Sequence, residues 1–131
     1  MSDVTLIYSS STILRNFKVN IMRIIKHKLH TEAGTQILYK LINEELQIVI
    51  GKAAVSRFNG EVRLHTIYIK PEYRGMGYGE RLIRKIIEDG GDTPISLCTH
   101  LGNISFFAKY DFEITKNEDD SSLVEMVRRT F

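Results

Sequence analysis

The sequence predicts a single domain of the α/β class, and within that class of the α+β type, in which a mixed sheet has helices on its faces. Three observations support this fold class. Strand-like apolar segments follow one another through the first half, a glycine-rich loop leads into an amphipathic helix, and strand-like segments return near the end. The 131 residues are enough for one domain with its own core. We therefore expect residues 1–131 to form one domain.

The N-terminal part predicts one strand and one helical region. Residues 4–8, VTLIY, have the composition of a short strand. Residues 9–30 predict a helical region, because serines at its start can cap a helix and its lysines can remain outside. The residues expected on its inward face are Ile21, Ile24, Ile25 and Leu29.

Residues 35–69 predict an antiparallel meander of three strands. The strands are expected at 35–42, 46–56 and 62–69. Asn59–Gly60 lies between two apolar runs, and this dipeptide is a strong signal for a hairpin turn. Pro71 ends the third strand, because proline has no N–H to donate to a strand neighbour.

The second half predicts two helices and three further strands. Residues 80–91 form a helix in this prediction, with the glycine pair at 90–91 ending it. Residues 94–100 form a buried strand, which the helical crossover places parallel to 62–69. A short helix is expected at 103–110. The last strands are expected at 112–115 and 121–130, with an acidic turn at 116–120 between them.

Composition and charge exclude several classes of protein. The net charge of +2 is too small to indicate a nucleic-acid partner, although the excess of lysine and arginine in residues 1–40 leaves a basic helical nucleic-acid binder as a third, weaker interpretation. No apolar run is long enough to span a bilayer, and the N-terminus lacks a signal-peptide pattern. The single cysteine, Cys98, excludes an internal disulfide, and no zinc-ligand spacing is present. We expect a cytoplasmic protein without metal or membrane partner.

The loop between the third strand and the next helix predicts an anion site. It carries Gly75, Gly77 and Gly79 behind Arg74, and a helix N-terminus follows. Glycines let the backbone approach a ligand closely, and N–H groups at a helix N-terminus favour a pyrophosphate. Glu80 follows the last glycine, where a nucleotide-hydrolysing P-loop needs lysine and then serine or threonine. The G-x-G-x-G spacing also differs from the dinucleotide fingerprint.

The segment Arg74-Gly75-Met76-Gly77-Tyr78-Gly79 fits the pattern Arg/Gln-x-x-Gly-x-Gly/Ala. Through this segment the chain resembles the GNAT superfamily, the GCN5-related N-acetyltransferases, and NISFFAKYDF at 103–112 resembles the family's second motif more loosely. The resemblance implies a mixed, mostly antiparallel sheet of six to seven strands with helices on both faces. It also implies an acyltransferase that moves an acetyl group from acetyl-CoA, its cosubstrate, to a primary amine by direct transfer in a ternary complex.

The resemblance assigns cofactor-binding roles to residues of this chain. Backbone groups of Ile67, Tyr68 and Ile69 would pair with the pantetheine arm. The amides of the glycine loop would bind the pyrophosphate, and these residues are Arg74, Gly75, Met76, Gly77, Tyr78 and Gly79. Strands 62–69 and 94–100 would separate to admit the thioester. Asn103 would hydrogen-bond the cofactor arm, and Phe107 would lie beside the thioester.

The chain departs from the family at the expected proton donor. Many members carry a tyrosine four residues after the helix-opening asparagine, and counting from Asn103 gives Phe107, which has no hydroxyl. Asp111 also replaces the usual glycine. Tyr110 is a substitute candidate, although a packing role suits it better. Tyr68 and Tyr78 are further candidates, with Tyr78 expected at the surface of the loop.

The sequence also leaves open which residue accepts the proton of the amine. Cys98 stands where some relatives carry a glutamate, and a small packed residue is its simpler interpretation. His65 and His100 could each exchange a proton near neutral pH, and Glu61 is a candidate of lower rank. The alternative to an enzyme is a GNAT-like regulatory module that binds acyl-CoA with weak or no catalysis. The acceptor amine, whether small molecule, peptide or protein, carries no readable motif, and either a monomer or a homodimer is compatible with the sequence.

Overall fold

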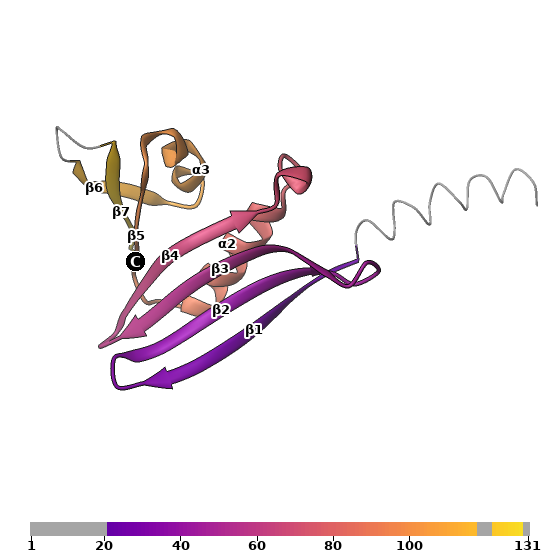
Figure 1. Ribbon diagram of the computed structural model, residues 1–131. Helices are drawn as coiled ribbons and strands as arrows, with labels where there is room; N and C mark the ends of the chain where they lie inside the picture. Colours follow the sequence, from indigo (N-terminus) through magenta and orange to yellow (C-terminus); the bar gives the residue numbers. More distant parts are fainter. Residues whose placement is uncertain (1–20, 118–121, 130–131) are drawn as a thin grey trace, which may run out of the picture.

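The computed structural model describes residues 21–117 and 122–129, which form one seven-stranded sheet with two α-helices (Figure 1). The strand order is β1-β2-β3-β4-β5-β7-β6, and only β4 and β5 are parallel neighbours. The strands are β1 (Met22–Thr31), β2 (Gly34–Asn43), β3 (Ile48–Phe58), β4 (Glu61–Ile69), β5 (Ile95–His100), β6 (Phe112–Asn117) and β7 (Leu123–Arg128). The helices are α2 (Tyr78–Gly90) and α3 (Ile104–Ala108), preceded by 3-10 turns at Pro71–Tyr73 and Leu101–Asn103.

Most of the predicted elements are confirmed. The meander, the loop, the helix α2, the parallel strand β5, the short helix α3 and the two final strands occur in the predicted order. The mixed, mostly antiparallel sheet of seven strands confirms the fold class. Among the described residues both helices lie on one face of the sheet, whereas helices were expected on both. The predicted strand at 4–8, the start of the predicted helical region at 9–20 and most of the acidic turn lie outside the described residues. No helix in the described part of the chain is long and apolar enough to cross a membrane.

The prediction of a helix through residues 21–30 is wrong. These residues form β1, which pairs with β2 over its whole length through a tight turn at Glu32–Ala33. Met22 and Ile24 point toward α2, whereas Ile25 and Leu29 point toward the opposite face of the sheet. The apolar residues occur at intervals that suit either period, so pairing with ten residues of β2 decides the conformation. The meander therefore has four strands instead of three.

Helix α2 provides the main packing against the sheet. Its residues Leu82, Ile83 and Ile86 are fully buried, in agreement with the predicted apolar face. They pack against the inward side chains of the central strands, which include Tyr39, Leu41, Ala53 and Val55. Helix α3 lies against the start of α2, because the Phe106 ring approaches Gly79 closely. Figure 1 shows α2 behind β2, β3 and β4.

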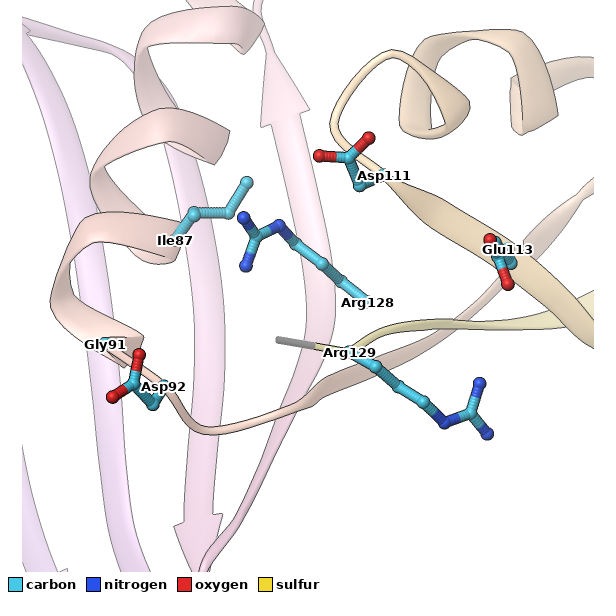
Figure 2. Close-up of a pocket in the computed structure, with 7 residues that line it drawn as sticks. All are labelled: Ile87, Gly91, Asp92, Asp111, Glu113, Arg128 and Arg129. Carbon is cyan, nitrogen blue, oxygen red and sulfur yellow. The ribbon is translucent and has the colours of Figure 1, made fainter. Parts of the chain in front are cut away.

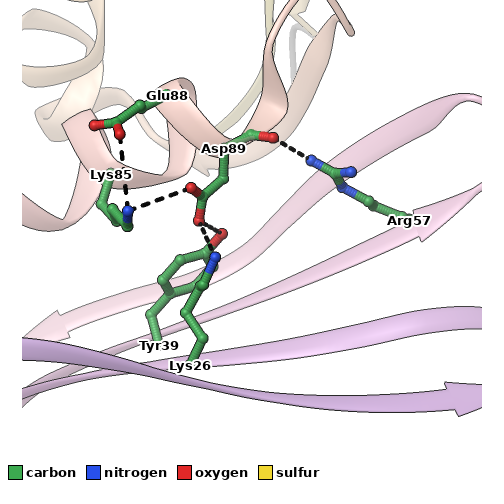
Figure 3. A network of polar contacts seen from close by, with 6 residues as sticks. All are labelled: Lys26, Tyr39, Arg57, Lys85, Glu88 and Asp89. Atoms are coloured by element: carbon green, nitrogen blue, oxygen red, sulfur yellow. Dashed lines mark hydrogen bonds and ion pairs between the residues drawn. The ribbon is translucent and has the colours of Figure 1, made fainter.

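A polar network fixes the C-terminal end of α2 to the sheet (Figure 3). The Asp89 carboxylate accepts hydrogen bonds from Lys26 Nζ at 3.0 Å and from the Tyr39 hydroxyl at 2.9 Å. Lys85 Nζ lies 3.5 Å from the same carboxylate. The Arg57 guanidinium donates to the Asp89 carbonyl at 2.6 Å. Three strands are thus tied to one helix end through one aspartate.

This network predicts a pH-dependent stability. Burial opposes ionisation of Asp89, but its hydrogen bonds from Lys26 and Tyr39 and the charge of Lys85 lower its pKa below the ordinary value. A depressed folded pKa means that this stabilisation is complete above the pKa of an unfolded aspartate, about 3.9, and is lost as the pH falls through the folded pKa. Asp89→Asn should lower the free energy of unfolding at pH 7 by about 1–2 kcal/mol.

Urea unfolding of both proteins at pH 7 and at about pH 2 tests this prediction. The difference between them should be present at pH 7 and nearly vanish at the low pH, where both side chains are uncharged. Glu88→Gln is the control, since Glu88 is exposed and lies 3.8 Å from Lys85. A difference that stays constant with pH would contradict the assigned role of the carboxylate charge.

Candidate active site

The candidate site begins where β4 and β5 separate. The two strands pair over three residues only, from Val62–Leu64 on β4 to Ile95–Leu97 on β5. Beyond this point β5 stays paired with β7, whereas the edge of β4 that faces away from β3 has no strand neighbour among residues 21–117 and 122–129. The backbone of β4 after Leu64 can therefore accept an extended ligand as an added strand. The expected separation of these two strands is confirmed.

The separated strands enclose a cavity of about 340 Å³. Its walls come from the ends of both strands, from the 3-10 turn and α3, and from the start of β7. The residues that line it are Leu64, His65, Thr66, Ile67, Leu97, Cys98, Thr99, His100, Asn103, Phe106, Phe107 and Leu123. Three of the four predicted catalytic candidates lie among them, as do three of the predicted cofactor-binding residues.

His65 occupies an irregular position in β4. The register between β3 and β4 shifts at Ala54–Val55, so that His65 is the extra residue of a β-bulge. Bulges redirect side chains and occur often beside active sites. The His65 Nε2 atom lies 2.7 Å from the Ser56 Oγ atom, which fixes the orientation of the ring. The bulge thus holds an imidazole at the edge of the cavity.

The end of β5 contributes Cys98 and His100, both exposed, with the buried Thr99 between them. Their alternation follows from the strand period, so Cys98 and His100 share the face of the sheet opposite to α2 and α3. Asn103 follows at the start of α3, and its amide nitrogen donates to the Thr99 hydroxyl at 3.1 Å. This bond orients the asparagine toward the cavity from the helix side.

Phe107 and Tyr110, the two aromatic residues expected near the thioester, differ in their position relative to the cavity. Phe107 is buried, and its ring lies edge-on to Phe106 at 5.1 Å and to Phe112 at 5.7 Å. Tyr110 is not among the residues that line the cavity. Its ring packs on Phe106, and the Arg84 guanidinium lies 5.8 Å from the ring centre. Burial and then the Glu80 carboxylate raise the pKa of Tyr110, which favours a protonated packing residue.

The glycine loop adopts a conformation that requires glycine. Gly75 and Gly77 have φ values of +78° and +86°, and a side chain there would meet no atom within 4 Å. Gly77 is the N-terminal cap of α2, a 13-residue helix, and no side chain among the described residues forms a cap hydrogen bond there. The Arg74 side chain is bound to the end of β4, because its Nε donates to the Ile69 carbonyl at 2.8 Å.

The expectation that Tyr78 lies at the surface of the loop is wrong. Tyr78 is buried at 7% exposure and lies edge-on to Tyr73, so it is a core residue and not a surface residue of the loop. Tyr68 and Met76 are exposed, and Arg74 stacks over the Tyr68 ring at 5.4 Å. Phe106 lines the cavity and approaches Gly79 of α2, so the cavity and the loop are adjacent parts of one site.

The sequence did not indicate several residues of the site. Thr99 and Leu123 reach the cavity through the register of β5 and β7, whereas Phe106 comes from α3. Ser56 on β3 contacts His65 without lining the cavity. No group of three potential metal ligands occurs among the described residues. The chemistry available in the cavity is therefore that of two imidazoles, one thiol, polar hydroxyl and amide groups, and free backbone of β4.

Comparison with protein families identifies the class. A model of the acetyltransferase (GNAT) domain matches residues 24–114. This range covers more than half of the chain, and the chain belongs to the GNAT acetyltransferase family. A comparison with curated proteins gave no match.

Solved structures share this fold at low sequence identity. The PaiA N-acetyltransferase from Thermoplasma acidophilum, in complex with coenzyme A, aligns with a TM-score of 0.60 at 22% identity, over 72% of this chain and 60% of that chain. Escherichia coli ElaA aligns with a TM-score of 0.65 at 17% identity, over 73% and 70% of the two chains. Arabidopsis thaliana Naa50, in complex with the bisubstrate analogue CoA-Ac-MVNAL, aligns at 0.58 and 22%, over 70% and 71%.

Proposed function

We propose that the protein is an N-acetyltransferase that uses acetyl-CoA as cosubstrate and acetylates a primary amine by direct transfer in a ternary complex. The observation that carries the proposal is the continuous site formed by the free edge of β4, the cavity beside it and the glycine loop at the start of α2. Coenzyme A in the PaiA structure and the CoA-linked analogue in the Naa50 structure support the choice of cosubstrate.

Backbone groups of the glycine loop and of β4 would make most of the polar contacts to acetyl-CoA. The amides of Gly75 to Gly79 would donate to the pyrophosphate, with the positive end of the α2 dipole adding to the attraction. The Arg74 N–H, which was expected to take part, already donates to the Pro71 carbonyl at 3.2 Å. The β4 backbone at Ile67, Tyr68 and Ile69 would pair with the amide groups of the pantetheine arm. In the present conformation the Ile69 carbonyl already accepts from Arg74. Asn103 and Phe107 would contact the arm near its thioester end.

The acetyl transfer requires a neutral amine held against an activated acyl group. Bound acetyl-CoA supplies the acyl group as a thioester. The C–N bond forms as the C–S bond breaks, the amine loses one proton and the CoA sulfur gains one. His65 and His100 are the imidazoles that line the cavity, and one of them would accept the proton of the amine. A backbone N–H of β4 would stabilise the carbonyl oxygen as negative charge develops on it. The free thiol of Cys98 suits a reducing compartment such as the cytoplasm.

Release of CoA from acetyl-CoA tests the proposal. Peptides, polyamines and amino sugars should be tried as acceptors, and at least one should give release above the hydrolysis background. The second candidate is a regulatory module that binds acyl-CoA without transfer, and the buried Phe107 favours it because this side chain has no proton to donate. Tight acetyl-CoA binding with release at background for every amine would select that alternative.

Phe107→Tyr tests the assignment of this position. A hydroxyl there would protonate the departing sulfur if residue 107 faces the thioester, and general acid catalysis of this kind contributes about 100-fold or more when fully developed. We expect kcat to rise at least roughly 10-fold with the acetyl-CoA affinity unchanged. The control is Tyr110→Phe, which removes a hydroxyl outside the cavity and should leave kcat within about twofold. An unchanged kcat in Phe107→Tyr would contradict the assignment.

A further inference from the structure

In the part of the chain that the structure describes, the strands β1 to β4 have one surface that neither α2 nor α3 covers. The residues that alternate with the buried ones point away from α2, and the buried ones include Tyr39, Leu41, Ala53 and Val55. Figure 1 views the sheet from this second side, with α2 behind β2, β3 and β4. We call this surface of β1 to β4 the outer face.

One row of side chains crosses the outer face from β1 to β4. The strand register places Ile25 of β1 opposite Lys40 of β2. Lys40 lies opposite Lys52 of β3, and Lys52 lies opposite Tyr68 of β4. We call these four residues the lysine row. The Arg74 guanidinium stacks over the Tyr68 ring at 5.4 Å, so a third cation lies at the β4 end of the row.

The two lysines at the centre of this row face each other without a counterion. Opposite residues on neighbouring strands have β-carbons about 4.5–5.5 Å apart, and like charges in this arrangement destabilise a sheet. Neither Lys40 nor Lys52 forms an ion pair or a side-chain hydrogen bond within residues 21–117 and 122–129. An anionic group bound between the two ammonium groups would relieve this repulsion.

The surface on both sides of the lysine row is aliphatic. Ile42 and Val49 lie opposite each other on one side of the row, and Leu38 and Ala54 on the other. All four residues are only half-buried. The strands β1 to β4 contain one acidic residue, Glu61, at the start of β4. The outer face is therefore an aliphatic surface with a positive row through its centre.

Charge excludes two occupants of the outer face. A second copy of the chain, packed face to face, would bring an identical positive row against this one. The N-terminal residues 1–20 carry Arg15 and Lys18 against Asp3, so this segment of the chain is also a poor electrostatic complement. The occupant that the charge favours is an anionic partner.

The aliphatic surface decides between two kinds of anionic partner. Single-stranded nucleic acids bind by stacking their bases on aromatic side chains, and the one aromatic ring of the lysine row already carries Arg74. A peptide segment with carboxylates on one side and aliphatic side chains on the other matches both parts of the surface. We propose that the outer face binds an acidic, amphipathic segment of a partner protein, with a carboxylate between Lys40 and Lys52 and apolar side chains on Leu38 and Ile42. This inference does not depend on the proposed acetyl transfer.

An NMR titration of the full-length, nitrogen-15-labelled protein tests the proposal. The probe is a synthetic helical peptide with glutamates along one side and leucines along the other, and the matched peptide has lysine at every glutamate position. We expect saturable shifts of the Lys40 and Lys52 amides with an apparent Kd of about 100 μM for the acidic peptide, and at least roughly 10-fold weaker binding of the basic one. Equal binding of the two peptides, or no saturable shift on the outer face, would overturn the proposal.

Amides around a second cavity provide the internal reference for this titration. That cavity lies at the C-terminal end of α2, and its lining residues come from α2, the turn after it, β6, β7 and the residue after β7, with none from β1 to β4 (Figure 2). The amides of Gly91 and Asp111, which line it, should not shift with the acidic peptide. Shifts there as large as those on the outer face would show non-specific binding and contradict the proposal.

Substitutions test the role of the lysine pair. The double variant Lys40→Gln/Lys52→Gln should weaken the acidic peptide at least about 10-fold, and its Tm should not fall, because the substitutions remove a repulsion. The control is Lys28→Gln/Lys109→Gln, which removes the same charge elsewhere: Lys28 pairs with the buried Ile37, and Lys109 follows α3. Wild-type affinity in the first variant, or equal loss in both, would contradict the assigned role.

The same spectra identify other occupants of the outer face. Binding of a single-stranded oligonucleotide at these amides as tightly as the acidic peptide would replace the protein partner with a nucleic acid. Nuclear Overhauser contacts between the Leu38 methyl groups and residues 1–20 in the free protein would place the chain's own N-terminal segment on this surface. Shifts of the lysine row that depend on protein concentration alone would indicate a dimer. Each of these three results would overturn the proposal.

Discussion

Gly77→Glu should abolish acetyl-CoA binding to within detection, with an affinity loss of at least about 100-fold. Gly77 caps α2 with a φ of +86°, and a side chain at this position would project into open space at the helix N-terminus. A carboxylate there would meet the pyrophosphate where the backbone N–H groups should bind it. Like charges brought together in this way cost several kcal/mol, and about 2.7 kcal/mol corresponds to 100-fold.

The matched control is Gly60→Glu. Gly60 lies in the β3–β4 turn with a φ of +77°, and a side chain there would also meet no atom within 4 Å. Both variants therefore introduce the same charge and similar backbone strain, but only one of them lies at the proposed pyrophosphate site. Calorimetric titration with acetyl-CoA should show wild-type affinity for Gly60→Glu. Equal loss in both variants would assign the effect to folding, and equal retention would contradict the site.

Gly34→Ala should destabilise the fold by at least about 3 kcal/mol. Gly34 opens β2 with a φ of +107°, and a β-carbon there would lie 2.1 Å from the Arg57 carbonyl oxygen on β3. That neighbour is backbone, so relief requires β2 and β3 to move apart. The strained φ and the overpacked contact each cost roughly 1–3 kcal/mol. Thermal unfolding should show a Tm lower by roughly 10 °C.

Gly60→Ala separates these two causes. It has a positive φ but no close neighbour, so it should cost only about 1 kcal/mol. The comparison also tests the pairing of β2 with β3, since the close approach at Gly34 is to the Arg57 carbonyl on β3. A Gly34→Ala protein as stable as Gly60→Ala would contradict the close approach of β2 and β3 at this point.

The sequence predicted the elements whose signals are local. Asn59–Gly60 indicated its turn by the backbone conformation it prefers, and the 3.6-residue spacing of Leu82, Ile83 and Ile86 indicated the buried face of α2. The glycine loop was recognised in the same way, because Gly75 and Gly77 are required by positive φ values. In each case the chemistry of a few adjacent residues determines the conformation.

Long-range features were predicted less well. Residues 22–31 form a strand because β2 pairs with them, and no local property of the lysine-rich stretch decides between helix and strand. The bulge that sets His65 at the cavity depends on the register of β3 against β4. Tyr78 is buried because Tyr73 and the core cover it, although it follows a glycine loop. Register and packing partners are absent from a single sequence, so these features required the structure.

Calorimetric titration of the folded wild-type protein with acetyl-CoA, with free CoA as the comparison, is the decisive test of the proposed cosubstrate site. We expect saturable binding of both ligands at micromolar concentrations, because the glycine loop binds the pyrophosphate that they share. Such binding would direct the search to the acceptor amine. A folded protein that binds neither ligand would show that the loop is only a turn between β4 and α2, and would contradict the proposed acetyl transfer.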